Sequence, residues 1–198
     1  QPVIDAMQQH INLEATIGGY EAADLKAKEI AGFYDSAAIL INGKAGNIAF
    51  TSSATNSYAR ALSCIPFQEG DSLLLANEDY ISNQLAFFSL QKRFNLKIFR
   101  AASLKEGGVD VEHMKRLMDA HHPKLVTLTH VPSNSGLIQP VEEVGRLCKE
   151  RNIYYLVDAC QSAGQIPLDV EKIHCDFLSV TMRKFLRGPR GAGFLYVS

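Results

Sequence analysis

The sequence predicts an α/β fold in which a mostly parallel β-sheet is covered by helices on both faces. Strand-like and helix-like segments alternate from residue 72 to residue 180. Most of the strand-like segments are continuously apolar, as expected of strands that are buried on both faces. Hydrophobic residues make up 46% of the 198 residues. This share is enough for one domain with a sizeable core.

The first 45 residues are predicted to be helical. Apolar residues recur at helical spacing over Val3–Leu13 and Ala22–Leu40, and Gly18-Gly19 separates the two segments. We therefore divide the chain into an N-terminal helical segment, 1–45, and an α/β domain, 46–198. The chain starts within a helix-like pattern and ends on a strand-like run, so we expect it to be part of a longer protein.

The α/β domain is predicted to contain strands and helices in regular succession. The predicted strands are Asn47–Thr51, Ser72–Ala76, Lys97–Arg100, Leu125–Val131, Tyr154–Val157, Asp176–Val180 and Gly193–Val197. The predicted helices are Asn56–Ile65, Ser82–Phe94, Val111–Ala120 and Val141–Asn152.

Charge and cysteine content bear on partners and location. The net charge of −1 gives no global attraction to nucleic acid or to an anionic membrane, and we expect neither as a partner. No apolar run is long enough to span a bilayer. The four cysteines form no Cys-x-x-Cys pair. We therefore expect reduced thiols, no metal site and a cytoplasmic location.

Polar residues follow the predicted strands at the point where each strand ends. Because ligands bind beyond the carboxyl ends of the strands in such sheets, we expect these residues to converge on one edge. They are Ser53-Ala54-Thr55, Asp79-Tyr80, Ser133-Asn134, Asp158 with Gln161, and Thr181 through Lys184.

Lys184 is the candidate nucleophile among these residues. It follows a buried strand and has Arg183, Arg187 and Arg190 nearby. Desolvation and like charge both favour the neutral amine of a lysine, and a neutral amine can form a Schiff base with a carbonyl. The alternative is an ordinary solvated basic loop.

Three other features suggest a common ligand, although each has a plain structural alternative. The Ser53–Thr55 turn can cradle a phosphate or simply cap a helix. Asp158 ends a buried strand, where it needs a cationic partner such as a protonated pyridine nitrogen, or it caps the next turn. Tyr80 can stack on a flat ring, pass protons, or pack as an ordinary half-buried tyrosine. Together with Lys184 they fit pyridoxal 5′-phosphate.

Longer motifs resemble the class V aminotransferase family, which includes cysteine desulfurases, C–S lyases and isopenicillin epimerase-like enzymes. The resemblance runs from about Gly46 to the end of the chain. It is carried by Val157 to Gly164, Pro167 to Val170, Cys175-Asp176-Phe177, Arg183-Lys184 and Gly188 to Tyr196. It implies the large domain of a fold type I enzyme, with a smaller C-terminal domain beyond Ser198, and a homodimer.

The resemblance also implies roles for particular residues. Lys184 would bind the cofactor aldehyde and move protons at the substrate α-carbon. Asp158 would pair with the pyridine nitrogen and Gln161 with the phenolic oxygen. Ala54, Thr55, Thr181 and Arg183 would hold the phosphate, and Tyr80 would take the ring-stacking place. Either Ser133 or Asn134 would lie near the cofactor, because Pro132 disturbs the register of that loop.

Two departures bear on the reaction. Desulfurases carry a ring-stacking His and a His before the lysine, whereas this chain has Tyr80 and Arg183 at those places. These variants are similar to the epimerase and C–S lyase branches. We expect an enzyme that cleaves a C–S bond of an amino acid. Transamination, epimerisation and a non-catalytic scaffold are the alternatives, and the absence of a Gly-x-Gly-x-x-Gly turn disfavours dinucleotide binding.

Overall fold

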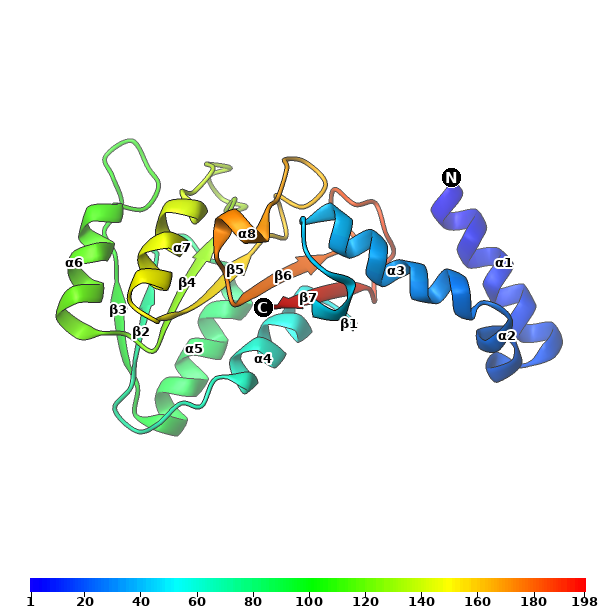
Figure 1. The fold of residues 1–198 in the computed structure, drawn as a ribbon, viewed down its shortest axis with the longest axis horizontal. Helices are drawn as coiled ribbons and strands as arrows, with labels where there is room; N and C mark the ends of the chain where they lie inside the picture. Colours follow the sequence, from blue (N-terminus) through cyan, green and yellow to red (C-terminus); the bar gives the residue numbers. More distant parts are fainter.

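The computed structural model, which describes residues 1–198, is an α/β fold built around one seven-stranded sheet (Figure 1). The strands are β1 (Ile48–Thr51), β2 (Ser72–Leu75), β3 (Lys97–Arg100), β4 (Leu125–Thr129), β5 (Tyr154–Asp158), β6 (Phe177–Thr181) and β7 (Gly193–Val197). The helices are α1 (Pro2–Ile17), α2 (Gly19–Leu25), α3 (Ala27–Leu40), α4 (Ala54–Cys64), α5 (Ile81–Phe94), α6 (Val111–His121), α7 (Val141–Glu150) and α8 (Val170–Ile173), with a 3₁₀ turn at Ala45–Asn47.

The strand order places the carboxyl ends of six strands along one edge of the sheet. The order is β1-β7-β6-β5-β4-β2-β3, and the pairs from β3 to β6 are all parallel. Strand β7 is antiparallel to both β6 and β1, so β1 runs in the same direction as β6. The prediction of a mostly parallel sheet is confirmed, and the six strands β1 to β6 all end at the same edge.

Helices cover both faces of the sheet, as predicted. Helices α4 and α5 pack on one face, and α3, α6, α7 and α8 pack on the other (Figure 1). Successive strand residues point to opposite faces, so Leu73 and Leu75 join the first layer while Leu74 joins the second. This arrangement explains why the strands are continuously apolar.

One predicted helix needs correction, and one short helix was not predicted. The single helix predicted over Ala22–Leu40 is interrupted at Lys26, which separates α2 from α3. Neither a glycine nor a proline marks this break, so the apolar pattern runs through it. Helix α8 was not predicted, because four residues are too few for a helical period. Its signal is local: the Asp169 side chain accepts hydrogen bonds from the N–H groups of Glu171 and Lys172.

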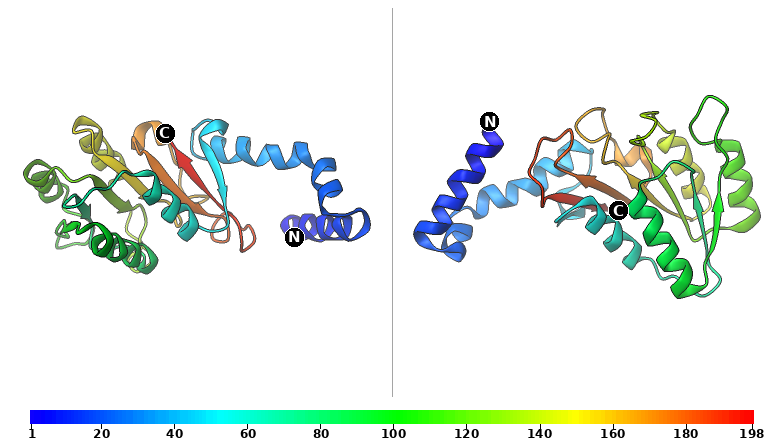
Figure 2. Two further views of the ribbon diagram at one scale, coloured as in Figure 1. Left: turned by 90° about the horizontal axis from the view of Figure 1, so that it is seen from below. Right: turned by 180° about the vertical axis from the view of Figure 1, so that it is seen from behind.

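The N-terminal helices form an arm that leads away from the sheet (Figure 2). None of the residues of α1 is buried, and Ala22 is the buried residue of α2. Apolar side chains such as Ile4, Met7 and Ile11 remain exposed on α1. No helix is long and apolar enough to cross a membrane.

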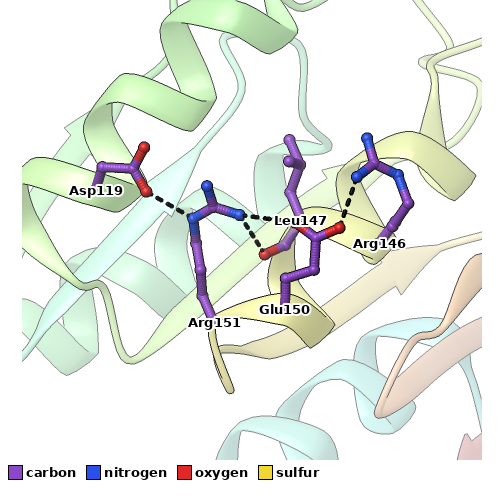
Figure 3. Close-up of polar contacts among 5 residues, drawn as sticks. All are labelled: Asp119, Arg146, Leu147, Glu150 and Arg151. Carbon is purple, nitrogen blue, oxygen red and sulfur yellow. Dashed lines mark hydrogen bonds and ion pairs between the residues drawn. The ribbon is translucent and has the colours of Figure 1, made fainter.

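Arg151, at the end of α7, connects helices α6 and α7 by hydrogen bonds (Figure 3). Its Nε donates to Asp119 on α6 at 2.7 Å, and its Nη1 donates to the Leu147 carbonyl at 3.0 Å. The Arg151 guanidinium lowers the pKa of the Asp119 carboxyl. Because Asp119 is exposed, this ion pair orients the end of α7 more than it stabilises the fold.

Candidate active site

A cavity opens where the carboxyl ends of the strands meet. Its empty volume, which includes the open solvent at its mouth, is about 640 Å³. All ten residues predicted for the site line this cavity: Ala54, Thr55, Tyr80, Ser133, Asn134, Asp158, Gln161, Thr181, Arg183 and Lys184. They come from segments that follow five different strands. The expected convergence of these segments is therefore present.

The N-terminus of α4 forms one wall of the cavity. Ser53 caps the helix, and its hydroxyl accepts a hydrogen bond from the Asn56 N–H at 3.1 Å. Ala54 and Thr55 occupy the first two helical positions, where backbone N–H groups have no partner within the helix. Ser53 thus acts as a plain cap, and the N–H groups beside it are still available to an anion.

A glycine allows this helix start to lie close to the sheet. A Cβ atom at Gly193, the first residue of β7, would lie 2.6 Å from the Val180 carbonyl oxygen and 3.2 Å from the Ser53 carbonyl carbon. The Ser179 hydroxyl donates to the Ala54 carbonyl at 3.2 Å. The position of the start of α4 therefore depends on β6 and β7.

Asp158 is held at the floor of the cavity by two hydrogen bonds. It is 5% exposed. Its Oδ1 accepts from the Cys160 N–H at 2.9 Å, and its Oδ2 accepts from the Asn83 side-chain amide at 3.0 Å. A buried carboxylate of this kind is stable only with donors or a cation around it.

Lys184 lies in the loop between β6 and β7, and its side chain is near Tyr80. Its Nζ is 5.9 Å from the centre of the Tyr80 ring, and its side chain is half-buried. Of the three arginines near it in sequence, Arg183 lines the cavity, whereas Arg187 and Arg190 do not. The cavity therefore combines one amine, one guanidinium and one aromatic face.

The loop after β4 brings two neighbouring polar side chains to the cavity. Ser133 and Asn134 both line it and both are exposed. The geometry therefore does not choose between them. Thr181, at the end of β6, is 5% exposed. In the sheet order, β5 lies between β6 and β4, so Thr181 and the loop after β4 lie on opposite sides of β5. Gln161 is half-buried, three residues beyond Asp158.

Sequence reasoning missed several residues of the cavity wall. Asp79, Asn83, Thr129 and Cys160 line it as well. Asp79 was recognised only as a residue that follows a strand. Asn83 lies one helical turn beyond Asp79, a spacing that brings side chains together on a helix start. Its contact with Asp158, 75 positions further along the chain, leaves no trace in the local sequence.

Comparisons with known proteins identify the family. The family model described as "Aminotransferase class-V" matches residues 1–198. A probable cysteine desulfurase of Methanothermobacter thermautotrophicus is 31% identical over 202 residues, which cover 100% of this chain and 50% of that protein. One from Pyrococcus abyssi is also 31% identical, with the same coverage of both proteins.

Solved structures are similar over almost the whole chain. The apo structure of a cysteine desulfurase from Thermococcus onnurineus NA1 has a TM-score of 0.89 and 28% identity, over 99% of this chain and 50% of that one. A C-DES mutant, described as having glycine covalently linked to its PLP cofactor, has a TM-score of 0.90 and 23% identity, over 99% of this chain and 53% of that one. The second likeness supports the fold alone.

These matches also set the scale of the chain. It spans about half the length of the curated relatives that it matches. The expected fold type I architecture agrees with the solved structures. Since the family model covers every residue, the chain belongs to the class V aminotransferase family.

Proposed function

We propose that this chain is the cofactor-binding part of a pyridoxal 5′-phosphate-dependent enzyme that cleaves the C–S bond of cysteine or a related amino acid. The single observation that carries the proposal is the joint presence of Lys184, Asp158 and the α4 N-terminus around one cavity. The relatives named as probable cysteine desulfurases support the substrate class.

The chemistry of the lining residues fits this cofactor. A phosphate dianion requires N–H, hydroxyl and cationic donors, and these are offered by the start of α4, Thr55, Thr181 and Arg183. A protonated ring nitrogen requires a buried anion, which Asp158 provides. The aromatic face of Tyr80 can pack on a flat ring.

The division of labour among the residues follows from this placement. Pyridoxal phosphate, when bound, supplies an electron sink for negative charge at the substrate α-carbon. Lys184 would hold the cofactor aldehyde until the substrate amine displaces it, and its freed amine would then take the proton from the α-carbon of the substrate. Asp158 would accept a hydrogen bond from the ring nitrogen and favour its protonated form. Gln161 would donate to the phenolic oxygen, and Ser133 or Asn134 would border the substrate.

The thiol that lines the cavity is poorly suited to accept sulfur. Cys160 is 7% exposed, and burial together with the negative charge of Asp158 raises the pKa of its thiol. A neutral thiol is a weak nucleophile. This observation favours C–S cleavage without transfer of sulfur to Cys160.

The test uses the full-length protein. With added pyridoxal phosphate we expect a visible absorption band, and with cysteine or a cysteine sulfoxide we expect the release of a sulfur product. Lys184→Ala should lose both the band and the turnover, whereas the exposed Lys172→Ala should keep them. Absence of the visible absorption band in the wild-type protein would contradict the proposal.

The cytoplasmic location and the homodimer remain proposals. The family resemblance suggests a homodimer. No residue of α1 is buried, which supports the proposal that this helix packs against a second copy of the chain. Sedimentation of the full-length protein as a monomer at micromolar concentration would contradict it.

A further inference from the structure

A buried side-chain amide links Asp158 to a second carboxylate. Asn83, in the first turn of α5, is 3% exposed. Its Nδ2 donates to Asp158 Oδ2 at 3.0 Å and to Asp79 Oδ1 at 2.9 Å. A side-chain amide has two N–H groups, so both of those of Asn83 are used. Rotation of Asn83 would break two hydrogen bonds to carboxylates, and the amide therefore fixes both of them.

The second carboxylate is itself held in one orientation. Asp79 Oδ1 also accepts from the Tyr80 N–H at 2.8 Å and from the Thr129 hydroxyl at 2.8 Å. With Asn83, three donors converge on this one oxygen. The other oxygen, Oδ2, accepts none of these bonds and is the site where a proton can add.

The surroundings of Asp79 move its ionisation from the acidic range to the range near pH 6. Burial and the negative charge of Asp158 raise the pKa of Asp79 to about 6, against the hydrogen bonds from Asn83 and Thr129. The other titratable or charged groups around it are Tyr58 from α4, Glu78 beside it, Asp158 and Cys160 at the end of β5, and Arg183 and Lys184 beyond β6. Burial raises the pKa values of Tyr58 and Cys160, so both stay neutral near pH 6.

We propose that Asn83 and Asp79 are positioning residues for Asp158. Asn83 aims the Asp158 carboxylate at the cofactor's ring nitrogen, and the negative charge of Asp79 behind it strengthens its hold on the protonated nitrogen. The inference rests on the proposed function, because it requires a pyridine ring in the cavity. It predicts that the ring contact weakens as pH falls through the range in which Asp79 takes up a proton.

Ligand pairs that differ only in the ring nitrogen provide the test. The full-length apoprotein is titrated with pyridoxal 5′-phosphate and with its 1-deaza analogue, which keeps the phosphate and the aldehyde but has carbon in place of the ring nitrogen. Asn83→Ala should weaken binding of the first ligand about tenfold, as expected for a lost hydrogen bond to a buried carboxylate. It should leave the affinity for the analogue unchanged.

The pH dependence of the same affinity ratio tests Asp79. Since both ligands share the phosphate and the aldehyde, their ratio cancels the titration of those groups and of Lys184. In the wild type the preference for the pyridine ligand should fall about tenfold below pH 6, the scale of one charge interaction in a protein interior. In Asp79→Asn the ratio should stay at the low value throughout.

A third variant moves the transition without removing any carboxylate. Thr129→Val deletes a hydrogen bond that lowers the pKa of Asp79, so the midpoint of the wild-type profile should move to higher pH. This variant retains Asn83 and keeps the inference testable if Asn83→Ala does not fold.

The binding results distinguish a failure of the positioning role of Asn83 and Asp79 from a failure of the proposed function. Equal effects of Asn83→Ala on both ligands, or a wild-type ratio that does not change with pH, would overturn the positioning role while both ligands still bind. Failure of both ligands to bind the wild-type protein would overturn the proposed function and the positioning role together.

Discussion

His130 is a histidine that the fold keeps neutral. It follows β4 and is 6% exposed, and its Nδ1 has no hydrogen-bond partner in the protein. Its backbone N–H donates to the Asp158 carbonyl at 2.9 Å, so its place in the chain is fixed by the strand that carries the site. Burial lowers the pKa of the His130 ring to about 4.

This shift predicts an acid-sensitive contribution to stability. Because the pKa in the folded state lies below the unfolded value of about 6.5, the contribution is full above pH 6.5 and is lost as pH falls toward 4. His130→Leu should therefore narrow the difference in melting temperature between pH 7.5 and pH 5.0. His10→Gln on α1 is the control, because the ion pair of a protonated His10 with Glu14 is exposed to solvent and contributes little to stability. It should leave that difference nearly as in the wild type. An unchanged difference in His130→Leu would contradict the burial of a neutral ring.

At the level of single residues, the sequence predicted which residues line the cavity better than it predicted which side chains form hydrogen bonds with one another. The ten predicted residues line one cavity because residues after parallel strands meet at one edge. The bridge from Asn83 to Asp158 was beyond prediction. It depends on how deeply α5 lies against the end of β5, which is a packing property with no local pattern.

At the element scale, α7 packs against α8 with no space for a side chain at Gly145. A Cβ at this position would overlap the Ile173 carbonyl oxygen, and it would lie 3.1 Å from the Tyr155 ring. A backbone carbonyl cannot rotate away as a side chain can. The glycine therefore sets the distance between α7 and the turn that leads into β6.

Substitution of this glycine should cost stability in spite of the better helix propensity of alanine. We expect Gly145→Ala to lower the free energy of unfolding by about 1–2 kcal/mol, because an overpacking cost of about 2–3 kcal/mol outweighs a gain of about 1 kcal/mol in helix propensity. Gly32→Ala in α3 is the matched control, because nothing lies within 4 Å of its added Cβ, and it should be stabilising. Urea unfolding measures both, and a Gly145→Ala protein as stable as the wild type would refute the overlap.

Elements were predictable where a long apolar pattern or a glycine marked them. Gly18 ends α1 with a φ of 99°, a conformation that glycine adopts readily, and the predicted break at Gly18-Gly19 is confirmed. The break at Lys26 and the single turn of α8 were not predictable from periodicity. The turn of α8 is set by the local hydrogen bonds of the Asp169 side chain rather than by an apolar face.

At the scale of the whole molecule, one sheet edge gathers the chemistry. Strand β7 reverses direction between β6 and β1, and this reversal brings the end of β1, with the start of α4, to the edge that carries Asp158 and Lys184. The two ends of a cofactor, an anionic group and a carbonyl, can thus be held by segments more than 100 positions apart in the chain. We propose that Lys184 is the residue that binds the carbonyl.

Chemical trapping by reduction shows which lysine binds the carbonyl. The full-length protein is incubated with pyridoxal 5′-phosphate, reduced with sodium borohydride, digested and analysed by mass spectrometry. The placement of Lys184 in the cavity predicts a reduced phosphopyridoxyl group on the peptide that contains Lys184, and on no other peptide in stoichiometric amount. A group attached to a different lysine, or no attachment at all, would contradict it.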